Sequence, residues 1–203
     1  MENGNVTVVT TEDGLSDNAV QSLCRDRLGN LWIGTIKGLN RLNPNTGKIS
    51  IYTVNDGLAD DNIYVIREDR EGSLWIGAQK GGLTRYKDGV FTRFTKKNGL
   101  GGEEIRCLLE DRAGNLWVGT DGGGLNRRDP VTGEFELYTT KDGLSSNIMA
   151  ALYEDVEGTL WIGTFGGGLN RLKNREFSSV TSKDGLFDDV VYHILEDAGN
   201  TCG

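Results

Sequence analysis

The segment EDRAGNLWVGTDGGGLNRRDP, residues 110–130, combines an adjacent pair of acids, a tryptophan between apolar residues and a run of three glycines. Taken alone, it fits a binding loop, an enzyme signature or a purely structural motif. The four tryptophans of the chain all stand in copies of this segment, at Trp32, Trp75, Trp117 and Trp161, with intervals of 43, 42 and 44 residues. A fixed period of this length predicts a repeat architecture, and the motif must be interpreted within that repeat.

A second marker, the tripeptide Asp/Asn-Gly-Leu, keeps the same period. It starts at Asp13, Asp56, Asn98, Asp142 and Asp184, and in every copy an aspartate follows 13 residues later, at Asp26, Asp69, Asp111, Asp155 and Asp197. In the four complete copies the tryptophan follows that aspartate by 6 residues. Length varies only around turn-like segments such as NPNTG and DPVTG, which indicates that one hairpin loop absorbs the differences.

Each unit contains four short runs typical of β-strands, separated by turns at hairpin distances. The first run is apolar on successive positions, as expected for a strand covered on both faces. Four-stranded units of this length predict an all-β chain, a β-propeller fragment with four complete antiparallel blades. The predicted blades are residues 15–54, 58–95, 100–140 and 144–181, flanked by a lone fourth strand at 5–11 and a lone first strand at 187–200.

The two ends suggest an interrupted ring. Every other copy continues into Leu-Trp where the last one reads Thr201-Cys202-Gly203, and codons for this tripeptide can encode Leu-Trp in another frame. We therefore expect residues 201–203 to be a truncation or frameshift scar. Such a chain stays open, closes imperfectly, or pairs with the remaining blades of a parent propeller or with a second copy.

The same residues carry a family resemblance. The stretch DGLSSNIMAALYEDVEGTLWIGTFGGGLNRLKNREF, residues 142–177, resembles the two-component regulator propeller repeat, and the likeness extends over residues 6–200. This resemblance implies a sensor region, usually extracytoplasmic, placed before a membrane helix and a histidine kinase or another signalling output. It also implies oligosaccharide ligands in many members.

Composition excludes several function classes. The net charge is −8 and the basic residues are scattered, so the chain lacks the positive surface that nucleic acids require. Cys24, Cys107 and Cys202 form no C-x-x-C pair, which argues against a zinc site and a disulfide framework. No apolar run approaches the roughly 20 residues of a membrane span and the N-terminus is not a signal peptide, so we expect no membrane insertion. We also expect neither a cofactor nor a metal.

The conspicuous repeated residues are interpreted as structural. The four tryptophans and the aspartates Asp26, Asp69, Asp111 and Asp155 are predicted packing and turn anchors, because each recurs at one place in every unit. The acid pairs Glu110-Asp111 and Glu154-Asp155 suggest a glycosidase, but adjacent strand residues point to opposite faces and a repeated pair is not a unique catalytic couple. His193 is predicted to be a core or channel residue rather than a base. The GGGLNR runs lack the following helix of a phosphate loop.

Candidate ligand-binding residues lie where the repeats differ. The loops after the second strands contain Lys37, Gln79, Lys80, Asp121 and Phe165 at equivalent or adjacent positions. Together with Tyr64, these residues offer aromatic faces for stacking on sugars and polar groups for hydroxyls.

The sequence therefore predicts a ligand-binding, non-catalytic sensor region of a bacterial two-component receptor, periplasmic or extracytoplasmic, for a glycan or another small molecule. Two alternatives stay open. One is a propeller glycan hydrolase or lyase, which needs an arginine, a tyrosine and carboxylates clustered on the channel face. The other is a scaffold for protein partners.

Overall fold

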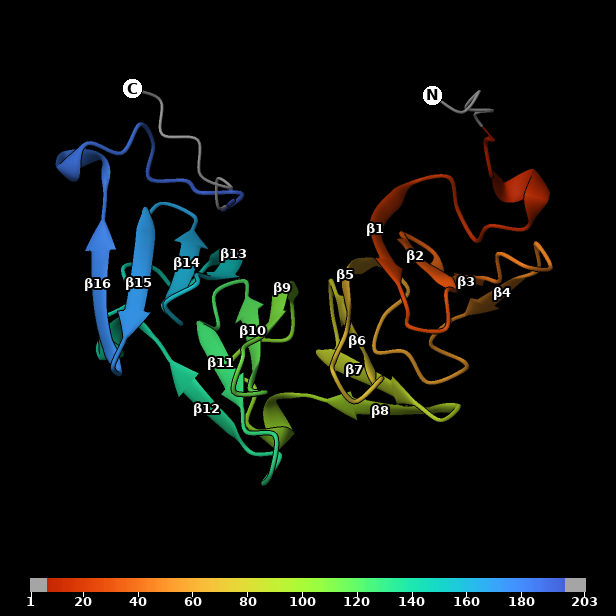
Figure 1. Ribbon diagram of the computed structural model, residues 1–203, viewed down its shortest axis with the longest axis horizontal. Coiled ribbons are helices and arrows are strands. Elements are labelled where there is room, and N and C mark those ends of the chain that lie inside the picture. The colour runs from red at the N-terminus through yellow and green to blue at the C-terminus, as the bar shows by residue number, and fades with distance from the viewer. Residues whose placement is uncertain (1–6, 196–203) are drawn as a thin grey trace.

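The computed structural model describes residues 7–195, and these form an all-β structure of sixteen strands in four antiparallel sheets. The sheets follow one another along an open arc, with the first strand of each sheet on the inner side and the fourth on the outer side (Figure 1). The strands of the first two blades are β1 (Val20–Arg25), β2 (Leu31–Thr35), β3 (Gly38–Leu42), β4 (Ile49–Tyr52), β5 (Ile63–Glu68), β6 (Leu74–Ala78), β7 (Leu83–Lys87) and β8 (Val90–Phe94). Those of the last two are β9 (Ile105–Glu110), β10 (Leu116–Thr120), β11 (Leu125–Arg128), β12 (Phe135–Tyr138), β13 (Met149–Glu154), β14 (Leu160–Thr164), β15 (Leu169–Lys173) and β16 (Glu176–Val180).

The four predicted four-stranded blades are confirmed, whereas the two predicted end strands are not seen in the described residues. Residues 7–11 and 187–195 contain no strand, and a 3₁₀ turn, η1 (Thr11–Asp13), begins inside the first of these segments. A strand needs a neighbouring strand for its ladder hydrogen bonds. Among the described residues, neither segment is accompanied by another strand of the same blade. The remainder of both predicted half-blades, and residues 201–203, lie outside the described residues.

Residues 189–191 nevertheless lie where the segment leading into the first strand of a following blade would lie. The Asp189 carbonyl accepts a hydrogen bond from Gly168 N at 2.7 Å, just as the Asn147 carbonyl accepts one from Gly124 N at 2.9 Å. Val191 lies against Gly163 of β14. The fifth copy of the repeat therefore begins to pack on blade 4 as each earlier copy packs on the blade before it.

The Asp/Asn-Gly-Leu marker forms the connection between blades. In four of the five copies the first residue of the marker ends a short 3₁₀ turn: after η1 these are η2 (Lys96–Asn98), η3 (Thr140–Asp142) and η4 (Ser182–Asp184). In the remaining copy Asp56 lies in a turn closed by its N–H, which donates to the Thr53 carbonyl at 3.0 Å. At η2, Asn98 Oδ1 accepts from Thr95 N at 2.9 Å, and Gly99 follows with a φ of 99°, a conformation that glycine adopts readily. Leu100 is then 3% exposed in the core. The marker is therefore a turn signal with an apolar anchor.

Blades pack on one another through a glycine of the second strand. A Cβ atom built on Gly77 of β6 would lie 2.6 Å from Ile105 Cγ2, on the first strand of the next blade. Ile105 and its counterparts Ile63 and Met149 are fully buried in this contact. We call this place, seven residues after the Asp/Asn-Gly-Leu start, the core position. The core position of blade 1 is Val20, which is 45% exposed because no blade precedes it among the described residues.

A hydrogen bond between the aspartate and the tryptophan occurs in each blade. The Asp111 carboxylate accepts hydrogen bonds from Trp117 Nε1 and Asn115 N, both at 2.8 Å, so it closes the turn between β9 and β10. Trp117 is 6% exposed within the core cluster around Leu125. The other three blades repeat the tryptophan bond at 2.8 Å, from Trp32 to Asp26, from Trp75 to Asp69 and from Trp161 to Asp155.

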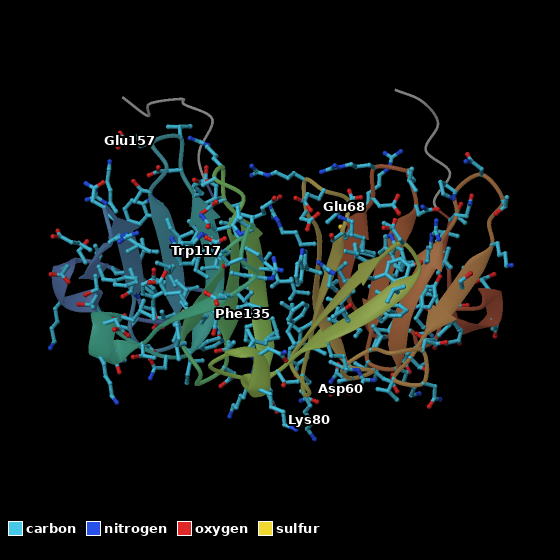
Figure 2. The ribbon with its side chains drawn as sticks, turned by 90° about the horizontal axis from the view of Figure 1, so that it is seen from below. Asp60, Glu68, Lys80, Trp117, Phe135 and Glu157 are labelled. Carbon is cyan, nitrogen blue, oxygen red and sulfur yellow. The ribbon has the colours of Figure 1, made fainter. Side chains whose placement is uncertain are left out.

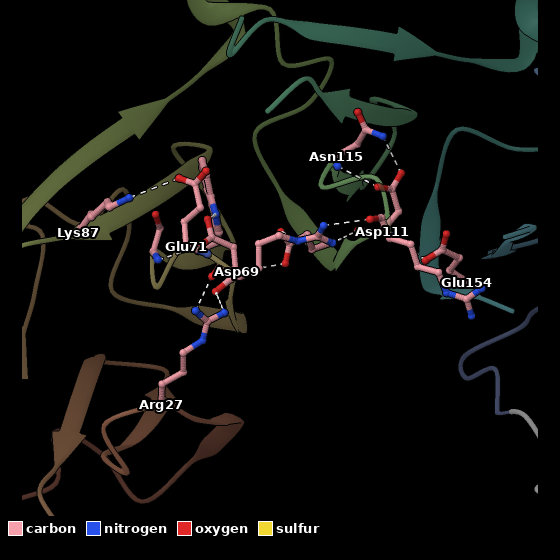
Figure 3. Close-up of polar contacts among 12 residues, drawn as sticks. Arg27, Asp69, Glu71, Lys87, Asp111, Asn115 and Glu154 are labelled. Atoms are coloured by element: carbon pink, nitrogen blue, oxygen red, sulfur yellow. Dashed lines mark hydrogen bonds and ion pairs between the residues drawn. The ribbon is translucent and has the colours of Figure 1, made fainter. Parts of the chain in front are cut away.

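An arginine just after the first strand links each of the first three blades to the next. Arg27 donates to the Asp69 carbonyl at 2.7 Å and Arg70 donates to the Arg112 carbonyl at 2.9 Å, so the turns of three blades are joined in series (Figure 3). Glu110 supports the second link, because its Oε1 lies 2.7 Å from Arg70 Nε.

The anchoring aspartates make stability depend on acidity. The hydrogen bond from Trp161, aided by the backbone N–H groups of Thr159 and Glu157, holds the pKa of Asp155 below its ordinary value. Burial raises the pKa of Asp26, but hydrogen bonds from Asn30 and Trp32 outweigh burial and lower it. A carboxyl group with a depressed folded-state pKa stabilises the fold above its unfolded pKa of about 3.9, and this contribution is lost as pH falls through the folded-state value.

We therefore expect the melting temperature to be flat above about pH 5 and to fall below about pH 4. The measurement is circular dichroism melting across this range, comparing the wild type with Asp155→Asn, which retains an oxygen acceptor for Trp161 but cannot titrate. The variant should lose less melting temperature between pH 5 and pH 3 than the wild type does. Equal losses would show that Asp155 does not contribute to the acid sensitivity.

Candidate functional site

The inner side of the arc is lined by the residue that follows the core position. These channel positions, eight residues after each Asp/Asn-Gly-Leu start, hold Gln21, Tyr64, Arg106, Ala150 and Tyr192. In a strand, successive side chains point to opposite faces, so packing of the core position against the previous blade turns its neighbour toward the channel. The channel positions, with Phe165 and His193, line a central hollow of about 440 Å³. Four of the five channel residues are polar or aromatic, which suits a ligand site.

Arg106 of β9 lines this hollow and contacts three other side chains. Its guanidinium donates to Asp121 Oδ2 at 2.7 and 3.2 Å and lies 2.7 Å from Glu104 Oε1. Its Cζ stands 5.1 Å from the centre of the Tyr64 ring, a cation–π distance. Burial alone would lower the pKa of Arg106, but the carboxylates of Asp121 and Glu104 outweigh it and raise that pKa above its usual value. Arg106 is therefore a fixed cation that positions three other polar or aromatic groups.

The remaining wall of the hollow has an aromatic part and an amide part. The rings of Phe165 and Tyr192 meet edge to face with centroids 5.2 Å apart. Asn62 joins the amide part, because its side-chain nitrogen donates to Gln79 Oε1 at 3.1 Å and its side-chain oxygen accepts from Gln21 at 2.5 Å. A ligand in the hollow would meet these aromatic rings and the amide of Gln21, while Asn62 and Gln79 lie behind Gln21 and do not line the hollow.

The structure brings together some of the predicted binding residues and not others. Tyr64 and Phe165 line the hollow, Asp121 is joined to it through Arg106, and Gln79 through Asn62. Two predicted lysines lie outside the lining. Lys37 forms an ion pair with Asp17 at 2.8 Å, and Lys80 lies at the same rim of the arc as Asp60, opposite the rim that carries Glu68 and Glu157 (Figure 2).

Sequence reasoning missed Arg106, Gln21, Ala150 and Tyr192. The signal was present: the channel position varies among amide, aromatic, basic and small residues, while the core position just before it stays apolar. The channel position varies in residue type from blade to blade, whereas the neighbouring core position is always apolar. This difference indicates that the channel side chain does not pack in the core and lies on a free surface. Only Tyr64 was selected from this set.

The acid pairs have structural partners. Glu110 accepts from the backbone N of Arg70 at 2.9 Å, and Asp111 accepts from Trp117. The pair at 154–155 has the same arrangement. Because each carboxylate of a pair satisfies a different neighbour, these acids do not converge on a common reacting atom. His193, in contrast, lines the central hollow.

A family model described as the two component regulator propeller matches the chain at residues 14–37, 57–80, 99–122 and 142–166. Each match runs from the Asp/Asn-Gly-Leu marker through the second strand to its loop. This chain carries four two-component regulator propeller repeats. The matches contain every core and channel position of the four blades, and with Phe165 they hold five of the seven residues that line the central hollow, whereas Tyr192 and His193 lie outside them.

Solved structures support the same fold for these propeller repeats. The extracellular domain of a hybrid two component system from B. thetaiotaomicron has a TM-score of 0.77 and 23% identity, covering 86% of this chain and 26% of that one. A second B. thetaiotaomicron extracellular domain has a TM-score of 0.68 and 27% identity, covering 83% of this chain and 25% of that one. The chain thus spans about a quarter of the length of these structures. Virginiamycin B lyase from Staphylococcus aureus shares the fold at a TM-score of 0.64 and 16% identity, covering 79% of this chain and 54% of the lyase. No curated protein matches the chain.

Neither a metal-binding cluster nor a membrane-spanning helix is present in the described residues. Within residues 7–195, no group of three or more histidine, cysteine, aspartate or glutamate side chains is arranged to hold a metal ion. Over the same residues, no helix is long and apolar enough to cross a membrane.

Proposed function

We propose that this chain is a ligand-binding part of an extracytoplasmic sensor region in a two-component signalling receptor, and that its ligand is a glycan or oligosaccharide. The repeats and the extracellular domains that share the fold support the sensor role. The central hollow carries the proposal for a ligand: it combines the rings of Tyr64, Phe165 and Tyr192 with an arginine held by two carboxylates. Aromatic faces and a few fixed polar groups are what a pre-formed site for a sugar requires.

The open end of the arc at β1 has an exposed apolar face. Val20 at the core position of blade 1 is 45% exposed and Leu23, three residues further along β1, is 61% exposed, while Ile63 at the core position of blade 2 is fully buried. We propose that a further blade of the same repeat covers this face, in continuity with the glycine contacts that join the other blades. The signalling output belongs to other parts of the receptor.

Binding to immobilised glycans tests the ligand assignment, with affinities then measured by calorimetry. We expect Phe165→Ala and Arg106→Gln each to weaken binding at least tenfold, because one removes a stacking face and the other removes the cation that orders Tyr64 and Asp121. Phe187→Ala is the matched control: Phe187 is a fully exposed aromatic residue that does not line the hollow. Equal affinities for all variants, or binding of proteins and no glycan, would contradict the proposal.

One observation favours a second candidate, a glycan hydrolase or lyase. Tyr64, Arg106, Glu104 and Asp121 form the arginine, tyrosine and carboxylate cluster that such an enzyme needs on its channel face. Both carboxylates are paired with Arg106, which suits a positioning role for them better than proton transfer. Mass spectrometry of the glycan panel after incubation separates the two candidates, because a sensor leaves every glycan intact and a hydrolase or lyase does not.

A further inference from the structure

A second hollow, remote from the channel, contains two arginines without an anionic partner. It lies between blades 2 and 3, on the side of the anchoring tryptophans, and measures about 280 Å³. Arg85 of β7 and Arg128 of β11 line it together with Trp75. We call it the arginine hollow.

The two guanidinium groups lie near the same ring. Arg85 Cζ is 5.9 Å and Arg128 Cζ is 5.3 Å from the centre of the Trp75 ring, and Arg128 Cζ is also 5.7 Å from that of Phe94. Burial lowers the pKa of Arg128, and the nearby charge of Arg85 lowers it further. Two cations are thus held close together at some electrostatic cost.

Neither arginine has a carboxylate partner. The Nε–H groups of Arg85 and Arg128 are both buried and donate no hydrogen bond, a state that they share with the Nε–H groups of Arg127 and Arg171. None of the ion pairs among residues 7–195 includes either residue. By contrast, Arg127, next to Arg128 on β11, pairs with Glu136 at 2.7 Å.

The acids that line the arginine hollow are already engaged. Asp69 accepts from Trp75 Nε1 at 2.8 Å, and Glu110 pairs with Arg70 at 2.7 Å. Glu71 lies 3.4 Å from Lys87 Nζ, a contact drawn in Figure 3. The charges of Asp69, Glu71 and Asp129 attract Arg128 from nearby, but none of these carboxylates forms an ion pair with Arg85 or Arg128 in the described residues.

The second arginine is peculiar to this place in the repeat. Arg85 has counterparts in all blades, namely Arg41, Arg127 and Arg171, each opposite the tryptophan of its own blade. Arg128, however, stands where the other blades have Leu42, Tyr86 and Leu172. The equivalent hollows, lined by Tyr86 in one case and Leu172 in the other, measure about 210 and 170 Å³. Burying part of a charged guanidinium where the other blades have leucine or tyrosine costs solvation free energy. A bound anion would offset this cost.

We propose that the arginine hollow binds an oxyanion of the phosphate or sulfate type between Arg85 and Arg128. Guanidinium groups present several N–H donors in a planar fork that matches such oxygens, and charge-assisted hydrogen bonds of this kind are strong. The anion would accept from the terminal N–H groups of the two guanidiniums, since the Nε atoms are buried, and would reduce the repulsion between the two cations. The site is independent of the central hollow, so this proposal does not rest on the glycan assignment.

Titration with inorganic phosphate tests the site, at constant ionic strength maintained with chloride and followed by calorimetry and thermal melting. We expect saturable binding that Arg128→Leu and Arg85→Gln each weaken at least tenfold. Leucine occupies the equivalent position in blades 1 and 4, so Arg128→Leu is expected to keep the fold, which circular dichroism checks. The matched control is Arg127→Leu, which removes a neighbouring arginine that does not line the arginine hollow and should leave phosphate affinity unchanged.

Phenyl phosphate, titrated in parallel, distinguishes a free anion from an anionic group of a larger molecule. Similar affinities for both probes assign the site to a free oxyanion, and tighter binding of phenyl phosphate assigns it to a phosphoryl group on a larger ligand. Either result supports an oxyanion site. Non-saturable stabilisation, or equal affinity in the wild type, Arg128→Leu and Arg85→Gln, would overturn it and leave the arginines as packing residues on Trp75.

Discussion

Trp117→Ala is expected to lower the free energy of unfolding by about 3–5 kcal/mol, a large share of the roughly 5–15 kcal/mol available to a domain. Trp117 is 6% exposed and packs with Leu109, Leu125 and Leu160 in one core cluster. Its removal opens a cavity and also takes a hydrogen-bond donor from Asp111. Urea unfolding followed by circular dichroism measures the loss without relying on tryptophan emission.

Trp117→Phe separates the two contributions. Phenylalanine keeps most of the buried ring but has no N–H group, so we expect a loss of about 1–3 kcal/mol from the smaller ring and the lost hydrogen bond to Asp111, whose Oδ2 still accepts from Asn115 Nδ2. If Trp117→Phe were as costly as Trp117→Ala, the hydrogen bond rather than ring burial would be the main anchor. A loss below about 1 kcal/mol for Trp117→Ala would contradict the anchoring role altogether.

The second large effect is expected at a glycine. Gly77→Ala should cost about 1–3 kcal/mol, because the new methyl group would lie 2.6 Å from Ile105 Cγ2 and from Val65 Cγ1. Gly77 is not among the residues with positive φ, so the cost comes from crowding between blades and not from the backbone conformation. Chemical denaturation measures this effect too, and its slope reports whether blade 3 separates from blade 2.

A double-mutant cycle with Ile105→Ala tests the cause. Ile105→Ala alone creates a cavity in a fully buried site and should cost about 2–5 kcal/mol. Ile105→Ala removes the Cγ2 contact at 2.6 Å but leaves the Cβ of residue 105 at 2.8 Å and Val65 Cγ1 at 2.6 Å. Part of the crowding is relieved, so the double variant should be more stable than the sum of the single losses predicts, by about 0.5–1 kcal/mol. Strict additivity would show that residues 77 and 105 do not compete for the same space.

The fold could be predicted from the repeat period because the residues that mark the repeat interact over short distances along the chain. The aspartate, the tryptophan 6 residues later and the Asp/Asn-Gly-Leu turn all act within one blade or at its border, so their spacing along the chain reports their geometry. The end strands predicted at 5–11 and 187–200 rested on the same spacing. Spacing identifies a copy of the repeat, but it cannot supply the neighbouring strand that makes a ladder.

The candidate site was predicted only in part because its contacts join different blades. Tyr64 and Arg106 are 42 residues apart in the chain, yet the guanidinium of one lies over the ring of the other. Variation among the repeats predicted five loop residues as binding residues, namely Lys37, Gln79, Lys80, Asp121 and Phe165. Variation alone does not show in which direction a side chain points. The channel position of the first strand does reveal it, since its neighbour is fixed in the inter-blade core.

The identical contact between successive blades has a genetic consequence. The core positions Ile63, Ile105, Met149 and Val191 each meet the glycine of the previous blade's second strand, so blades are interchangeable partners rather than parts of unique pairs. Unequal recombination between the DNA of two repeats would add or delete one whole period and leave every surviving joint complementary. The number of blades can therefore change in a single event, while residues at the channel positions diverge one at a time.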